Sequence, residues 1–127
     1  MVIDLSSVVG CFVDRDGMGN YEMTFNEYQE LTKRTMKNRT KNEFLLGLAG
    51  EVGEFLEVVK KETYQGHPES EDKKKLELGD VLRYLTGLCN LYGYSLEEIA
   101  TLNIIKTNVR YPDGFSEEAS INRKDVK

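Results

Sequence analysis

Leu48-Ala49-Gly50-Glu51-Val52-Gly53-Glu54 and Glu77-Leu78-Gly79-Asp80-Val81-Leu82 are the two stretches that decide the fold of this chain. Each carries two carboxylates three residues apart, inside an apolar run of helical period. Side chains three apart lie on one face of a helix, so two such helices packed antiparallel would bring all four carboxylates together. Four anions gather in a fold only where a cation neutralises them, which predicts a metal site. The four candidate ligands are Glu51, Glu54, Glu77 and Asp80.

The plain alternative is that these acids are solvated surface charges, as most helical Glu and Asp residues are. The glycines beside them argue against it. Each glycine in a helix interior costs about 0.8 to 1 kcal/mol relative to alanine, so five cost about 4 to 5 kcal/mol. A cost of this size indicates close helix packing, room for a bulky ligand beside the carboxylates, or both. The five are Gly47, Gly50, Gly53, Gly79 and Gly87.

The rest of the chain has the pattern of helices joined by short connections. Capping boxes, in which a serine or threonine precedes a glutamate by three residues, predict helix starts at Thr24 and Ser95. Apolar residues at steps of three and four predict helices over about residues 43–61 and 72–92. The helix that starts at Ser95 is expected to end before Pro112. We therefore expect an all-α fold, an antiparallel bundle of four to five helices completed by oligomerisation.

The chain divides into three parts by this pattern. Residues 1–23 are expected to form an N-terminal arm or small hairpin, and residues 24–116 the helical domain. Residues 117–127 form a polar C-terminal tail that we expect to fray. The length of 127 residues suits one domain with one core.

Composition excludes several classes of partner. The net charge of −5 leaves no basic surplus for stable nucleic-acid binding. No apolar run is as long as a membrane span, which predicts a protein that does not insert in membranes. The two cysteines, Cys11 and Cys89, lack motif spacing, and the start of the chain lacks the basic region of a signal peptide. We expect a cytoplasmic protein in which Cys89 is a core residue.

The ligand types narrow the identity of the metal. Carboxylate oxygens without nearby His or Cys favour Mg²⁺, with Mn²⁺ as the alternative, over Zn²⁺. A di-iron bundle would need Glu-x-x-His motifs. The only histidine, His67, lies in a predicted loop, so the acids predict a magnesium site.

The acidic stretches resemble the E-x-x-E and E-x-x-D signature of MazG-like nucleotide pyrophosphohydrolases, within the all-α NTP pyrophosphatase superfamily. Downstream, Asn103-Ile104-Ile105-Lys106 and Arg110-Tyr111-Pro112-Asp113-Gly114-Phe115 are similar to the N-x-x-K and R-Y-P-x-G-F ending of many members. Thr24-Phe25-Asn26-Glu27-Tyr28-Gln29 resembles their usual first helix. The resemblance covers about residues 24–116.

The resemblance implies a Mg²⁺-dependent enzyme that cleaves nucleoside triphosphates between the α- and β-phosphates, giving a monophosphate and pyrophosphate. It implies that all four acids bind metal. Glu51 and Glu54 would be catalytic, with Glu54 orienting or deprotonating the attacking water. It also points to a homodimer or a dimer of dimers. The implied contacts to phosphate or sugar are Asn103, Lys106 and Arg110.

Two features of the chain depart from the family pattern. Arg83 occupies a position where relatives often carry an aromatic residue, and the chain has no tryptophan. Stacking on the base would therefore come from Tyr or Phe, although aromatic residues at helical spacing are commonly core. The candidates are Tyr28, Tyr84 and Phe44.

Rival interpretations remain open at this point. A phosphoribosyl-ATP pyrophosphatase shares the fold and the acidic signature. A non-catalytic helical interaction module with a metal or nucleotide site would bind Mg²⁺ without releasing pyrophosphate. Lys106 and Arg110 would then be only favourable cations near the end of a helix.

Overall fold

The computed structural model describes residues 23–68 and 71–126, which form five α-helices and one short 3₁₀ turn. The predicted all-α class with four to five helices is confirmed. The predicted N-terminal arm lies almost entirely outside the described residues. The elements are α1 (Phe25–Thr32), the 3₁₀ turn η1 (Lys33–Thr35), α2 (Lys41–Tyr64), α3 (Glu71–Tyr92), α4 (Leu96–Arg110) and α5 (Glu117–Asn122).

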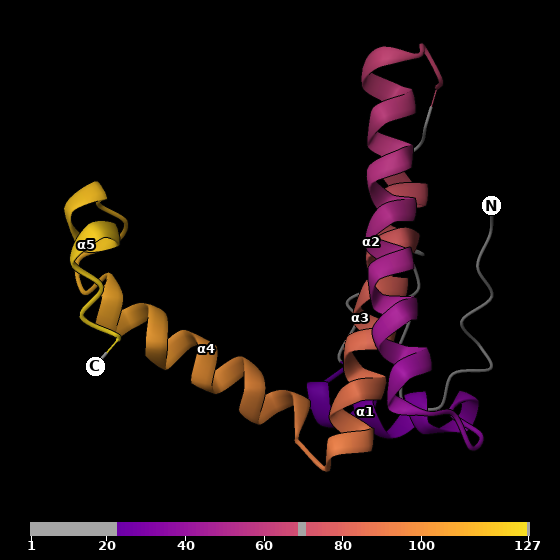
Figure 1. Ribbon diagram of the computed structural model, residues 1–127, viewed down its shortest axis with the longest axis horizontal. Helices are drawn as coiled ribbons and strands as arrows, with labels where there is room; N and C mark the ends of the chain where they lie inside the picture. The colour runs from indigo at the N-terminus through magenta and orange to yellow at the C-terminus, as the bar shows by residue number, and fades with distance from the viewer. Residues whose placement is uncertain (1–22, 69–70, 127) are drawn as a thin grey trace, which may run out of the picture.

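The body of the molecule is the long antiparallel pair of α2 and α3, which stand side by side in Figure 1. They have 24 and 22 residues, so each is over 30 Å long at about 1.5 Å per residue. Phe44 and Val58 of α2, with Leu88 and Cys89 of α3, are buried. The expected core position of Cys89 is confirmed.

Side-chain caps set the beginnings of the helices. The hydroxyls of Thr24 and Ser95 accept hydrogen bonds from the N–H groups three residues later, as the capping boxes predict. Thr40 caps α2 in the same way and starts it slightly earlier than expected. Ser116 caps α5, so the tail expected to fray contains a helix. Acidic residues in its first turn favour that helix start.

The turn between α3 and α4, which we call the elbow, is held against α1 by hydrogen bonds. The Gln29 amide donates to Asn90 Oδ1 at 3.0 Å and to the Tyr94 carbonyl at 2.8 Å. Its oxygen accepts from the Leu96 N–H at 2.8 Å. These bonds hold α1 across the foot of the α2–α3 pair and fix the direction in which α4 leaves it (Figure 1).

Apolar side chains expected in the core lie at the surface of the single chain. In α2, the apolar residues at steps of three and four form a stripe that includes Leu45, Val52 and Leu56, which are exposed. The face that meets α3 instead carries Phe44 and Glu51. Helix α4 exposes a further apolar set. Its members are Ile99, Leu102, Ile104, Ile105 and Val109.

Within residues 23–68 and 71–126, no helix combines the length and the apolarity needed to cross a membrane.

Candidate metal centre

Three of the four predicted acids meet between α2 and α3. Glu51 comes from α2, and Glu77 and Asp80 come from consecutive turns of α3. One carboxylate oxygen from each lies within 4.8 Å of the others, and all three residues are half-buried. The i, i+3 spacing places both α3 acids on the face that meets α2. The two acidic helices therefore bring together three of the four predicted acids.

Glu51 is the innermost of the three. Its Oε2 atom is buried and has no hydrogen-bond partner among the described residues. Burial raises the pKa of Glu51 above its ordinary value, and the charges of Glu54, Asp80 and Glu77 and a hydrogen bond with Glu54 add to that rise. A buried, unpaired carboxylate oxygen is unfavourable unless a proton or a cation satisfies it.

Glu54 lies at the edge of the cluster. It is exposed and stands one turn beyond Glu51, and its charge and hydrogen bond act on Glu51. It is not among the three residues whose oxygens come together. Its carboxylate is open to solvent beside the inner three, which is a position suited to handling a water molecule.

The donor set fits a hard divalent cation. All donors are carboxylate oxygens, the ligands that Mg²⁺ and Mn²⁺ prefer. Mg²⁺ usually keeps several waters and takes few protein ligands, so three clustered carboxylates with one open side suit it. Glu51, Glu77 and Asp80 would hold such an ion, and the unpaired Glu51 oxygen would gain a partner.

The glycines of the two helices fall into two kinds. A side chain added at Gly47 would overlap the Tyr84 ring, and one added at Gly87 would overlap the Phe44 ring. These two positions permit close helix packing. A side chain added at any of the other three would meet nothing within 4 Å. Those three flank the acids, and they are Gly50, Gly53 and Gly79.

The predicted substrate contacts on α4 do not reach the acids within one chain. Helix α4 leads away from the α2–α3 pair (Figure 1), and Asn103 and Lys106 are exposed on it. Arg110, at the far end, donates from Nε and Nη2 to the two oxygens of Asp125, at 2.7 and 2.6 Å. The structure therefore separates these three residues from the carboxylate cluster.

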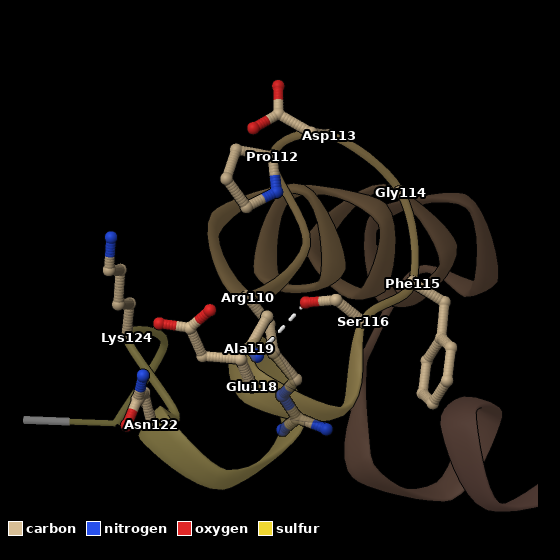
Figure 2. A pocket seen from close by; sticks show the side chains of 10 residues that line it. All are labelled: Arg110, Pro112, Asp113, Gly114, Phe115, Ser116, Glu118, Ala119, Asn122 and Lys124. Atoms are coloured by element: carbon tan, nitrogen blue, oxygen red, sulfur yellow. Dashed lines mark hydrogen bonds between the residues drawn. The ribbon is translucent and has the colours of Figure 1, made fainter.

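Asp125 was not predicted to take part in any site. Its side chain is 2% exposed, and Arg110 holds the pKa of its carboxyl well below the usual range. Residues of this region surround a cavity of about 340 Å³, whose lining side chains appear in Figure 2. They include Arg110, Phe115, Ser116, Asn122 and Lys124.

The aromatic candidates separate by burial. Phe44 is core, and its ring lies 5.4 Å from that of Tyr84, which covers Gly47. Tyr28 of α1 differs from both. Burial raises its pKa, the charge of Arg83 lowers it, and the charge of Asp80 raises it, so its hydroxyl lies near both groups. Among the three aromatic candidates, Tyr28 is thus the one on which the charge of Asp80 acts.

Comparison with known proteins identifies the family of this chain. The family model described as the MazG nucleotide pyrophosphohydrolase domain matches residues 39–115. Searches of curated proteins and of solved structures found no match. The matched region contains the whole acidic cluster and all of α4, and it covers more than half of the chain. The chain therefore belongs to the MazG nucleotide pyrophosphohydrolase family.

Proposed function

We propose that this protein is a Mg²⁺-dependent nucleoside triphosphate pyrophosphohydrolase, with Mn²⁺ as an alternative metal. It cleaves the bond between the α- and β-phosphates, giving NMP or dNMP and pyrophosphate. The observation that carries the proposal is the convergence of Glu51, Glu77 and Asp80, together with the buried Glu51 oxygen that has no partner among the described residues. Membership of a pyrophosphohydrolase family supports it.

The acids have distinct roles in this mechanism. Glu51, Glu77 and Asp80 hold the cation, with Glu54 as a further ligand at the open edge. The bound metal supplies positive charge for the phosphate chain and for the attacking water. Glu54 orients that water and accepts its proton, and Glu51 assists from one helical turn away. The water oxygen adds to the α-phosphorus as the bond to the bridging oxygen breaks, and pyrophosphate leaves with the bonding electrons.

A second copy completes the site in this proposal. One chain leaves apolar faces of α2 and α4 exposed, and it keeps Asn103, Lys106 and Arg110 away from the acids. In a homodimer, or a dimer of dimers, these faces are covered and α4 of one copy approaches the acids of another. Asn103, Lys106 and Arg110 then contact phosphate or sugar. Asp125 occupies two of the five N–H donors of Arg110 and leaves the others for substrate.

Localisation and domain organisation complete the proposal. We infer a cytoplasmic enzyme that acts on free nucleotides, without stable binding to nucleic acid. The functional unit is residues 24–116, and residues 1–23 and 117–127 are appendages to it. The acidic composition is consistent with the lack of stable nucleic-acid binding.

Pyrophosphate release tests the proposal directly. Wild type and the Glu51→Ala and Asp80→Ala variants are incubated with Mg²⁺ and a panel of canonical and modified NTPs and dNTPs, with phosphoribosyl-ATP included. Loss of a metal ligand should lower turnover by about 10³-fold or more, because charge stabilisation at the phosphates is lost.

The matched control removes a carboxylate outside the cluster. Glu57 lies on the same helix and pairs with Lys60 and Lys61 at the surface. Glu57→Ala should keep wild-type turnover. Turnover by Glu51→Ala equal to wild type would show that the assignment is wrong. Mg²⁺ binding without pyrophosphate release would favour the non-catalytic module.

A further inference from the structure

Arg83 is a half-buried cation on α3, one helical turn beyond Asp80. Residues three apart share a helix face, so Arg83 lies on the same side of α3 as Asp80. Within residues 23–68 and 71–126, no carboxylate pairs with Arg83. Three lysines of these two helices, in contrast, form ion pairs. Lys60 and Lys61 pair with Glu57, and Lys74 pairs with Glu62 and Glu71.

The position of Arg83 relative to the cluster follows from Tyr28. The phenol of Tyr28, on α1, lies close enough to Arg83 and Asp80 for both charges to act on its pKa. Arg83 therefore stands on the α1 side of the carboxylates, where α1 crosses α3. At that place the Arg83 guanidinium, one turn from Asp80, forms no ion pair with any carboxylate of the described residues.

We propose that Arg83 binds the phosphate chain of the substrate at the acidic cluster, as the arginine that each chain supplies to its own site. This inference rests on the proposed function. A guanidinium presents planar N–H groups that match phosphate oxygens. Arg83 takes up negative charge that grows on the pyrophosphate as the α–β bond breaks. It acts from α3, independently of the cations on α4.

The experiment compares Arg83→Gln and Arg83→Lys with wild type in steady-state pyrophosphate release. Four NTPs that differ only in the base serve as substrates. Arg83→Gln should lower kcat/KM by about 10- to 100-fold, the effect of losing a charge-assisted hydrogen bond to phosphate. The loss should be equal for all four bases. Arg83→Lys should recover part of it, because a lysine keeps the charge without the planar donors.

Two further measurements exclude a structural effect. Titration with Mg²⁺ alone should give the same or tighter binding in Arg83→Gln, because a cation beside the carboxylates is removed. The control is Lys75→Gln, which removes an exposed cation from the same helix and should leave kcat/KM unchanged. Circular dichroism shows whether each variant keeps its helices, and Arg83→Lys serves as the test if Arg83→Gln unfolds.

The outcomes separate this inference from the proposed function. A wild type that releases no pyrophosphate from any nucleotide contradicts the proposed function. An active wild type with unchanged kcat/KM in Arg83→Gln overturns only the role of Arg83. A loss that differs more than tenfold between bases also overturns it, because Arg83 would then read the base. Weaker Mg²⁺ binding in Arg83→Gln would mean that the residue only supports the cluster.

Discussion

Two parts of the α2–α3 pair use glycine for opposite purposes: a packed end near the foot and, about one to two turns further along, a region we call the open end. Near the foot of the pair, Gly47 and Gly87 lie under the rings of Tyr84 and Phe44, where any side chain would overlap an aromatic carbon. Further along, the glycines beside the acids face open space. One end gives up side chains so that the helices pack closely, and the other leaves room next to the carboxylates.

The loss of helix propensity at the glycines is offset differently in the two parts. At the packed end, the loss of helix propensity is offset by aromatic contacts, because the Phe44 and Tyr84 rings pack with their centroids 5.4 Å apart. At the open end, no protein contact offsets it among the described residues. These glycines therefore leave space beside the three carboxylates that the described residues do not fill.

The largest expected effect is at the open end and depends on metal. Mg²⁺ at 100 times its Kd should stabilise the wild type by about 2.7 kcal/mol, because it binds only the folded state. Glu51→Gln should lose most of this gain, since it loses the innermost ligand. Thermal unfolding with Mg²⁺ or with a chelator measures it. Equal stabilisation of both proteins would place the metal elsewhere.

The pH dependence of the metal-free protein sharpens the same point. The pKa of Glu51 is raised in the folded state, so the folded protein binds this proton more tightly than the unfolded chain. The stability this proton provides is fully present below the ordinary Glu pKa of about 4.3 and is lost as pH rises through the raised pKa. In the metal-free Glu51→Gln protein, stability should not fall as pH rises through this range. Parallel pH profiles for the two proteins would contradict it.

The packed end should respond to an added methyl group with a loss of stability. Gly87→Ala places a Cβ into the Phe44 ring, and overpacking of this kind costs about 1 to 3 kcal/mol. Urea unfolding of the variant and of wild type gives the difference. Gly79→Ala, on the same helix but in open space, is the matched control and should not be destabilised. A stable Gly87→Ala protein would remove the distinction between the two ends.

The smallest expected effect is a gain in the free energy of unfolding. Gly53→Ala should raise the free energy of unfolding by about 0.5 to 1 kcal/mol through helix propensity alone. The same methyl group narrows the space beside the carboxylates, so pyrophosphate release should fall although stability rises. A variant that gains stability and keeps full turnover would show that the open space is not used by substrate.

Much of the fold follows from local sequence signals. The caps at Thr24 and Ser95 form as predicted, because each depends on residues within one turn. The meeting of Glu77 and Asp80 with Glu51 follows from their spacing. The inward position of Glu51 could not be predicted in this way, because the apolar stripe around Val52 suggested that a different face of α2 packs against its neighbour. That stripe is exposed in the single chain, so the sequence carries a packing pattern that one chain does not satisfy.

The pairing of Arg110 with Asp125 shows the limit of local reading. The two residues are 15 apart and meet only because α5 folds the chain back. Its cap, Ser116, lacks the glutamate three residues later that marks the other caps, so the helix was missed. The position of Arg83 beside Tyr28 likewise depends on how α1 crosses α3, which no periodicity encodes.

Because α4 is anchored at its start, near Gln29, a small rotation there moves its far end by a larger distance. Its 15 residues form an arm of about 22 Å, so a change of about 5° at the elbow moves its far end by about 2 Å. The three hydrogen bonds of Gln29 are short, and they anchor both sides of the turn between α3 and α4. The Gln29 amide, together with the bond from Asn26 to Glu97, therefore helps to set how far Lys106 and Arg110 reach without touching either of them.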